Sequence, residues 1–392
     1  MPVTLKTTQK QGFEHPEAPQ GWSSWKFPWK QAAFWALLVF GIFNMALWRL
    51  EGKKSTDVWH GTGSIDLAVG QFKQLNARPT VVLLGSSLMM YPFWSMDLAL
   101  DPKHVGDIFH HHGSLALEED LRKAGFANPH VFSLAIFGQM VSDAFIYVNE
   151  FLRKDKAPEF LVYGVAPRDF SDHDLSSPMA TNTFQRLVNL DNLEPYANLY
   201  LPGFQDKVEF LMSRICYLYN HRSRIQQEFG KAVQKGYIAG HMQAPLQEKT
   251  DSSNAGFLMF GGFTARWENS RKEYERRYKN IGEQDLSLQM SFLKRLLEVA
   301  HERGIKVVLV NMPLSDMNRN LLPPAFYKQF RNELKTLANR PDVRFLDIGD
   351  SPDFNRMDFW DTAHLGPPGG RKILTHLMPV LSEMHNGAAV QK

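Results

Sequence analysis

Short apolar runs alternate with amphipathic stretches along most of the chain. The apolar runs are rich in Val, Ile and Leu and are bounded by turn residues, which predicts buried strands. The stretches between them repeat apolar residues every three or four positions, which predicts helices packed on a sheet. The expected strands are 80–85, 130–136, 159–165, 306–312 and 343–348, and the expected helices are 114–125, 139–154, 284–304 and 325–340. This alternation predicts an α/β fold with a doubly wound parallel sheet.

The alternation is interrupted between about residues 170 and 283, where no strand pattern is convincing. We interpret this segment as a mostly helical insertion on the core rather than as an independent domain. It contains the basic run RKEYERRYK at 271–279, which we interpret as a solvated helix face.

Residues 31–48 form an uncharged and almost wholly apolar stretch near the N-terminus. As a helix, at about 1.5 Å per residue, it is just long enough to cross a hydrocarbon core. Tryptophans at 25, 29, 35 and 48 are typical of interface anchors. We expect an uncleaved transmembrane anchor rather than a signal peptide or a buried core helix, because the preceding tail is long and a small-residue cleavage site is missing. The flanking Lys and Arg residues are nearly balanced, so the charges do not decide the orientation.

Composition narrows the function classes further. The 392 residues are 44% hydrophobic, enough for a sizeable core, and carry a net charge of only +3. That charge is too small to argue for nucleic acid binding. Cys216 is the single cysteine, which excludes an internal disulfide and is expected to be a buried apolar residue.

The candidate catalytic residues come after expected strands, at the sheet edge where open parallel sheets bind ligands. Gly-Ser-Ser at 85–87 is either a plain turn or a nucleophile, Ser87, presented ahead of a helix. A serine nucleophile needs a histidine base, an acid that orients the histidine, and N–H donors for the oxyanion. His364, Asp361 and the N–H groups of Ser87 and Gly138 fill those roles.

The spacing of Asp361 and His364 carries little weight alone, because Asp-x-x-His occurs four times. The other pairs are Asp57/His60, Asp101/His104 and Asp107/His110. The fourth pair differs by its context, since it follows the last expected strand and leads into Gly/Pro and a helix start. An ordinary N-terminal cap with a helix-side histidine is the other interpretation.

These segments resemble the SGNH/GDSL superfamily of serine hydrolases and acyltransferases. LLGSSLMM is similar to its first block, with Ser87 as nucleophile and Ser86 where Asp is commoner. Gly138 in SLAIFGQMVSD resembles the second-block oxyanion glycine, and DTAHLGPPGG resembles the last block. The third-block asparagine is missing from VYGVAPRDF; either Arg168 donates instead, or two backbone N–H groups suffice.

Within this superfamily the chain most resembles the anchored SGNH-like proteins of cell-envelope polymer modification. The reasons are Ser86 in place of Asp, the missing third-block asparagine and the apolar N-terminal stretch. Such proteins include alginate and cellulose O-acetylation proteins and the D-alanine transfer protein of lipoteichoic acid synthesis; a related uncharacterised bacterial family with a GVAPRDF-type block is the alternative. The resemblance implies a serine acyltransferase or esterase that acts on acyl esters, with acetyl as the expected group, of an envelope or extracellular polysaccharide. A catalytically degenerate scaffold that binds glycan or a membrane-bound O-acyltransferase is the competing function, favoured by the missing asparagine.

The resemblance also implies a location and a division of the chain. We expect a single pass through the bacterial inner membrane, a periplasmic catalytic domain and a membrane-bound O-acyltransferase as partner. The expected divisions are a disordered cytoplasmic tail at 1–25, the anchor at 26–50, a linker and helical lead-in at 51–77, and the SGNH-like domain at 78–392. No cofactor is expected, and the histidines at 110–112 are not expected to form a metal site, because three successive side chains cannot point one way.

Overall fold

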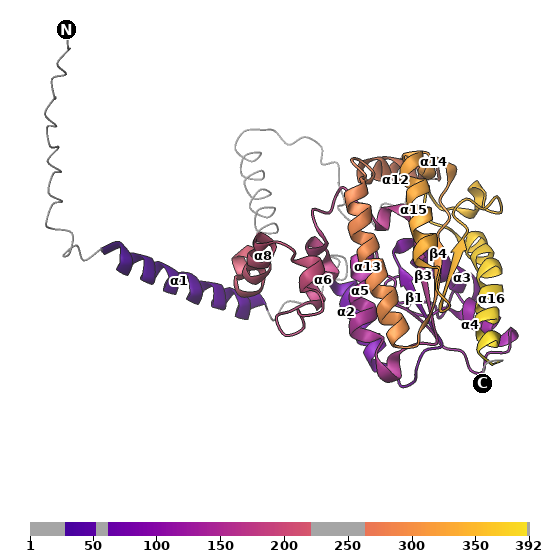
Figure 1. The fold of residues 1–392 in the computed structure, drawn as a ribbon, viewed down its shortest axis with the longest axis horizontal. Coiled ribbons are helices and arrows are strands. Elements are labelled where there is room, and N and C mark those ends of the chain that lie inside the picture. The colour runs from indigo at the N-terminus through magenta and orange to yellow at the C-terminus, as the bar shows by residue number, and fades with distance from the viewer. Residues whose placement is uncertain (1–27, 52–61, 221–262, 390–392) are drawn as a thin grey trace, which may run out of the picture.

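The computed structural model describes residues 28–51, 62–220 and 263–389 (Figure 1). A five-stranded, fully parallel sheet forms its centre, with the strand order β2-β1-β3-β4-β5. This is the order of flavodoxin-like sheets, in which ligands bind at the switch point between β1 and β3. The strands are β1 (Val81–Gly85), β2 (Val131–Ser133), β3 (Phe160–Val165), β4 (Lys306–Asn311) and β5 (Val343–Asp347).

All five expected strands are confirmed, and β2 is shorter than expected. Residues 134–136 leave the strand but stay beside β1, since the N–H of Leu134 donates to the carbonyl of Leu83 and that of Ile136 donates to Gly85. Every residue of β1 and β3 is buried, as expected for strands covered on both faces.

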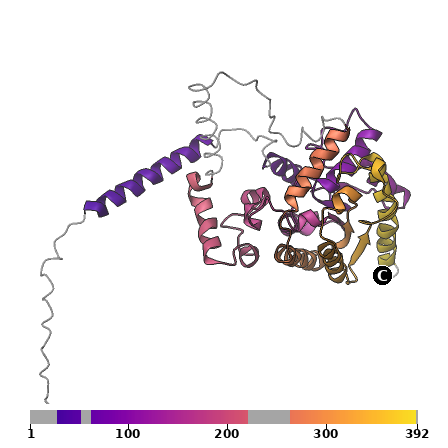
Figure 2. The ribbon, with the colours of Figure 1, turned by 90° about the horizontal axis from the view of Figure 1, so that it is seen from above.

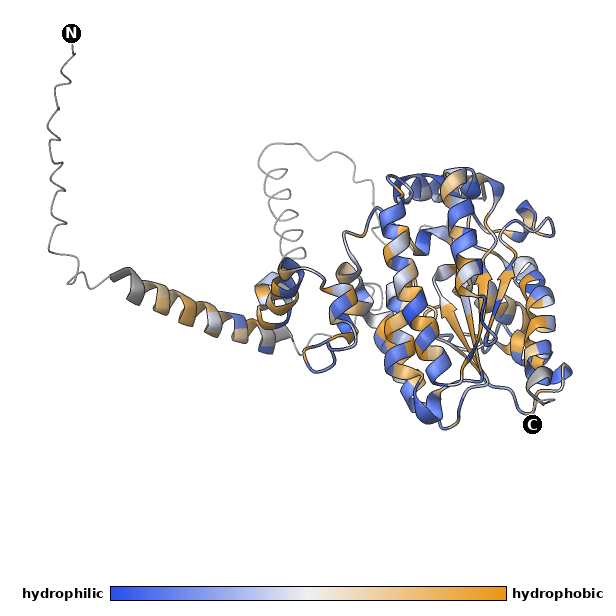
Figure 3. Ribbon diagram, viewed as in Figure 1, coloured by the Kyte–Doolittle hydropathy of each residue, from blue (hydrophilic) through white to orange (hydrophobic). Residues whose placement is uncertain are grey.

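Helices cover both faces of the sheet (Figure 1). One face carries α5 (Val141–Phe151), α13 (Glu283–Glu302) and α15 (Pro324–Leu337). The other carries α3 (Ser87–Leu100), α4 (Leu115–Lys123) and α16 (Pro367–Ala389). The four expected helices are therefore confirmed as α4, α5, α13 and α15. Figure 3 shows the apolar strands enclosed between helices whose outer surfaces are polar.

Two close contacts fix α3 against its neighbours. A Cβ on Gly85 would lie 2.5 Å from the carbonyl oxygen of Gly164 in β3 and 2.7 Å from Cγ of Met89 in α3, so no side chain fits where α3 begins. At its other flank, a Cβ on Gly370 of α16 would lie 2.8 Å from the carbonyl oxygen of Pro92. Small residues at these points let α3 sit tightly between the sheet and α16.

The described part of the segment between β3 and α13 consists of helices joined by turns and irregular stretches, and it adds no strand to the sheet. One face of the basic run at 271–279 packs inward, because Tyr274 and Tyr278 are buried and Arg277 pairs with the buried Asp172. The interpretation of the whole run as a solvated face is therefore wrong. The helices of this segment are α6 (Asn182–Leu187), α7 (Ala197–Tyr200), α8 (Phe204–Ile215), α9 (Tyr217–Asn220) and α12 (Phe263–Arg277), and α2 (Thr62–Gln74) lies against α6.

The expected transmembrane stretch, residues 31–48, falls in α1 (Pro28–Glu51). In the described ranges, no helix combines the length and the apolar character needed to cross a membrane. The structure thus does not support the transmembrane anchor that the sequence predicts. The expected tail at 1–25 and residues 52–61 of the linker lie outside the described residues.

The tight turn at Gly85 gives a stability prediction. Gly85→Ala should lower the free energy of unfolding by about 1–3 kcal/mol, because Gly85 has φ +143° and the new Cβ would meet a backbone carbonyl. Gly70→Ala in α2 is the matched control, since no atom lies within 4 Å of its Cβ position. Urea unfolding measures both; equal midpoints for Gly85→Ala and the unmodified chain would contradict the contact.

Candidate active site

Ser87 is the first residue of α3, directly after β1. The turn is held by the N–H of Gly85, which donates to Oε1 of Gln139 at 2.9 Å. Ser86 caps the helix and is only 1% exposed, whereas Ser87 is partly exposed. Of the two adjacent hydroxyls, only that of Ser87 is accessible to a substrate.

Ser87 lies in hydrogen-bond contact with His364. Oγ of Ser87 is 2.8 Å from Nε2 of His364, and Nδ1 of His364 is 2.8 Å from Oδ2 of Asp361. The other oxygen of Asp361 accepts the N–H groups of Ala363 and His364 at 2.8 and 2.9 Å. With the histidine proton on Nδ1, Nε2 is left to accept the proton of the serine hydroxyl. The structure therefore joins three of the sequence-predicted site residues into one relay.

Burial and pairing shape the protonation of this relay, since His364 and Asp361 are only 5% and 3% exposed. Burial acts to raise the pKa of Asp361, but the neighbouring His364 and the N–H donors outweigh it and hold that pKa below its ordinary value. Burial acts to lower the pKa of His364, but Asp361 outweighs it and raises that pKa. The pair is therefore arranged to stabilise an imidazolium that forms when Ser87 loses its proton.

The Asp-x-x-His spacing by itself produces a paired histidine. Nδ1 of His104 is 2.9 Å from Asp101 and Nδ1 of His110 is 2.7 Å from Asp107, matching the bond at His364. These two histidine side chains are 80% and 53% exposed, against 7% for His364. Burial and contact with a serine distinguish the candidate catalytic pair. The fourth pair, Asp57 and His60, lies outside the described residues.

Gly138 and Arg168, the two other predicted site residues, lie side by side. Gly138 has φ +70°, and a Cβ there would be 3.3 Å from Nη2 of Arg168. Within the described part of the chain, the N–H of Gly138 donates to no acceptor. The pair lies near the serine turn, because Gln139, next to Gly138, accepts the N–H of Gly85.

Arg168 is held in a buried network of charges. It is 6% exposed, and its Nη2 lies 2.9 Å from Asp172, while Nη1 lies 3.3 Å from Asp169. Arg277 of α12 contacts the same oxygen of Asp172 at 2.5 Å. Burial raises the pKa of Asp169 to about 6, although Arg168 and the N–H of Ala166 oppose that rise. Asp169 and Asp172 therefore fix the guanidinium of Arg168, and α12 is tied to it through Arg277.

Sequence reasoning missed several residues that shape the site. The ring of Tyr91 lies 4.6 Å from the ring of His364, and Oγ of Ser270 lies 2.6 Å from Oγ1 of Thr362. Tyr91 follows Ser87 by one helical turn, so a face argument could have placed it. Ser270 comes from α12, and no spacing in the sequence indicates that this helix reaches the segment before His364.

The histidines near residue 111 have separate partners. Nε2 of His111 lies 2.7 Å from Asp97, and Nδ1 of His112 lies 3.1 Å from the carbonyl oxygen of Ser133. Burial lowers the pKa of His112 to about 4. Among the residues that the structure describes, no three His, Cys, Asp or Glu side chains are grouped to hold a metal ion.

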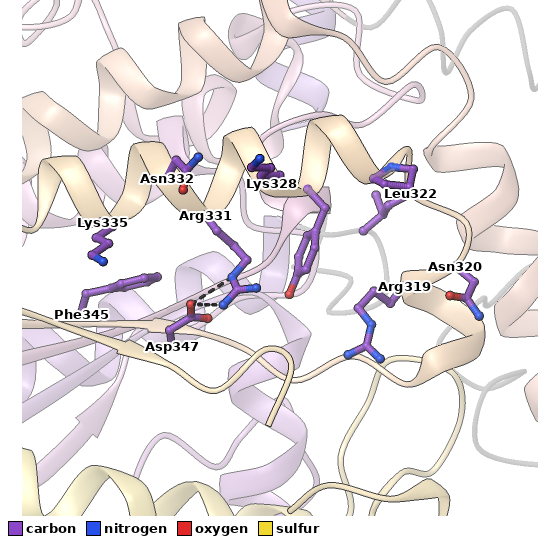
Figure 4. Close-up of a pocket in the computed structure, with 11 residues that line it drawn as sticks. Arg319, Asn320, Leu322, Lys328, Arg331, Asn332, Lys335, Phe345 and Asp347 are labelled. Carbon is purple, nitrogen blue, oxygen red and sulfur yellow. Dashed lines mark hydrogen bonds and ion pairs between the residues drawn. The ribbon is translucent and has the colours of Figure 1, made fainter. Parts of the chain in front are cut away.

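Two adjoining cavities open near the carboxyl ends of β4 and β5. One, of about 540 Å³, is lined by four basic side chains, and Arg331 within it pairs with Asp347 at 2.6 Å (Figure 4). The second, of about 480 Å³, shares Arg319 with the first and reaches Trp267 and Phe359, two residues before Asp361. The two cavities together therefore extend from the basic residues toward the segment that carries Asp361 and His364. The four basic residues are Arg319, Lys328, Arg331 and Lys335.

Comparison with known proteins gives one family and a weak structural likeness. A crystal structure described as a candidate acylhydrolase from Bacteroides fragilis is 11% identical, with a TM-score of 0.35, over 84% of this chain and 98% of that one. No curated protein matches the sequence. Residues 68–381, most of the chain, match the model of a family described as a protein of unknown function, DUF1574. The chain belongs to the DUF1574 family.

Proposed function

We propose that the protein is a serine-dependent enzyme of the SGNH type that hydrolyses or transfers acyl esters. The observation that carries this proposal is the relay itself, with contacts of 2.8 Å from Ser87 to His364 and from His364 to Asp361. A partly exposed hydroxyl, a buried imidazole and a buried carboxylate in that order are the arrangement that activates a serine.

The geometry supports a two-step reaction. Oγ of Ser87 attacks the carbonyl carbon of the ester while Nε2 of His364 takes the hydroxyl proton. The tetrahedral intermediate collapses, the ester C–O bond breaks, and His364 returns the proton to the leaving alkoxide, which leaves an acyl-Ser87. In the second step His364 deprotonates water or a sugar hydroxyl, which attacks the acyl carbonyl and releases Ser87. Water completes a hydrolysis, and a sugar hydroxyl completes a transfer.

The oxyanion of that intermediate requires donors beside Ser87. We propose the N–H groups of Ser87 and Gly138, with Arg168 in place of the missing third-block asparagine. Arg168 is suited to this role because it lies beside Gly138 and two buried carboxylates fix it. A guanidinium would place a full positive charge where the amide of an asparagine places a partial one.

The proposal also concerns the molecule that carries or accepts the acyl group. We propose an envelope or extracellular polysaccharide, acylated above all with acetyl, as the resemblance to envelope acylation proteins implies. The two cavities support this acceptor, since each is larger than one small ester needs and the exposed Lys328 and Lys335 line one of them as cationic donors. A membrane-bound O-acyltransferase as donor partner and a periplasmic location at the inner membrane remain part of the proposal.

A catalytically degenerate scaffold is the competing function, because the third block holds no asparagine. The two proposals differ in whether Oγ of Ser87 is an activated nucleophile. A fluorophosphonate probe should label Ser87 if the relay works and should label neither Ser87 nor Ser86 in a scaffold.

Replacement of Ser87 tests the relay directly. Ser87→Ala should lower p-nitrophenyl acetate turnover by roughly 10³-fold or more while unfolding is unchanged, because one hydroxyl at a helix start is removed. His364→Ala should be as severe, and Asp361→Ala somewhat less so. Ser86→Ala and His104→Ala are the matched controls and should retain turnover. Full activity in Ser87→Ala would mean that Gly-Ser-Ser at 85–87 is an ordinary turn without a nucleophile.

Arg168→Lys tests the proposed oxyanion donor. The lysine keeps a cation beside Asp172 but loses the planar fork, so kcat should fall roughly 10–100-fold while KM changes little. Arg186→Lys, the same exchange at the ion pair with Asp66 that joins α6 to α2, is the control. A loss confined to KM would assign Arg168 to substrate binding instead.

The raised pKa of His364 predicts the pH profile. The base must be neutral, so kcat/KM should fall on the acid side around a pKa above the ordinary histidine value of about 6.5. Asp361→Asn removes the carboxylate that raises this pKa, so its inflection should move to lower pH along with lower activity. An inflection that Asp361→Asn leaves in place would assign the titration to another group.

A further inference from the structure

Exposed apolar side chains gather on two helices of the described chain, α1 and α8. On α1, Phe34, Trp35, Val39, Ile42 and Met45 are each at least 60% exposed. These five lie toward one side of the helix, at about 100° per residue, whereas the exposed Leu37, Phe40 and Phe43 lie on the remaining sides. Exposed apolar residues therefore occur around most of the circumference of α1. Apolar surface of this extent is unfavourable in water and marks a place of contact.

The apolar residues of α8 form a single outward stripe. Phe204, Val208, Leu211 and Ile215 follow one another at intervals of four, three and four residues, and they are 83, 43, 45 and 52% exposed. Intervals of three and four keep side chains on one face of a helix. The opposite side, with the buried Phe210, packs on the protein. The stripe therefore adds nothing to the core and needs another partner.

The two apolar surfaces are joined. The side chain of Asn44 in α1 donates from Nδ2 to the carbonyl oxygen of Ile215 at 2.9 Å and accepts the N–H of Leu218 through Oδ1 at 3.3 Å. This polar residue thus fixes α1 against the C-terminal end of α8. Figure 2 shows α1 meeting that end and extending away from the sheet in a direction different from that of α8.

We propose that α8 lies on the surface of a lipid bilayer, with its stripe among the acyl chains next to α1. A protein groove has a fixed shape and would cover one side of α1, whereas a lipid surface adapts to apolar side chains that leave the helix in several directions. The stripe of α8 is narrow, and the exposed Lys207 stands beside it, as on helices that lie in a membrane interface with a cation near the headgroups. This inference does not depend on the proposed catalysis. Two helices that contact lipid in different directions would fix the orientation of the sheet relative to the bilayer, which one flexible tether would not.

Site-specific labelling tests the proposal on the full chain. In a Cys216→Ser background, Phe204→Cys and Leu211→Cys carry an environment-sensitive nitrobenzoxadiazole label, and Met357→Cys is the control, because Met357 is 79% exposed elsewhere on the surface. The probe is a vesicle of phosphatidylcholine and phosphatidylglycerol. On vesicle addition, labels at 204 and 211 should shift to shorter wavelength and lose emission when the acyl chains carry a doxyl quencher. The label at 357 should do neither.

Three results would overturn the proposal. Labels at 204 and 211 that stay unchanged while the protein floats with the vesicles would leave lipid contact to α1 alone. A shift without vesicles that grows with protein concentration would assign the stripe to a second copy of the chain. An equal shift at 357 would mean adsorption without orientation. The urea unfolding midpoint of each labelled variant, compared with that of the Cys216→Ser chain, reports that the protein remains folded whether or not it has esterase activity.

Discussion

The placement of every polar group in the site follows from one constraint, a parallel sheet buried on both faces. Its strands carry apolar side chains along their length, since a polar side chain there would have no partner. Polar chemistry is therefore displaced to the strand ends. Ser87 follows β1, Arg168 follows β3, and Asp361 and His364 come after β5. The same constraint brings these distant segments to one edge, because all carboxyl ends of parallel strands meet there.

The charged groups at this edge are stable because they are paired. Asp361 stays ionised in a buried place with His364 and two N–H donors beside it. Arg168 is buried with two carboxylates, and one of these is shared with Arg277. Removing any one of these charged side chains would leave its partner as an uncompensated buried charge, which is costly in free energy. The helical segment that contributes Arg277 is thus part of the site's electrostatics, although it adds no strand to the sheet.

Much of the core could be predicted from the sequence because neighbouring residues are enough to indicate each strand and helix. Each expected strand is a continuous apolar run, and each confirmed helix repeats apolar residues on one face. Ser87, His364 and Asp361 could be proposed because the residues around each of them are characteristic. The inward face of α12 could not be predicted, since Tyr274 and Arg277 stand in a run dominated by charged residues. The link from Asp172, which pairs with Arg168, to Arg277 could not be predicted either, because Asp172 and Arg277 are 105 positions apart. The apolar stretch at 31–48 predicts a transmembrane helix, but no helix among the described residues is long and apolar enough to cross a membrane.

The contact between Ser87 and His364 also determines at which stage of synthesis and folding the site can form. The two residues are 277 positions apart, and the histidine is followed directly by α16, the last described helix, which packs on α3. A chain emerging from the ribosome carries its serine 277 positions ahead of its base, so the serine has no base until those residues have been synthesised. During synthesis, and during any passage across a membrane in an unfolded form, the serine would remain chemically inert. Activity would thus report completed folding of the whole parallel sheet, and a C-terminal truncation short of His364 would yield a chain with its nucleophile in place and no means to activate it.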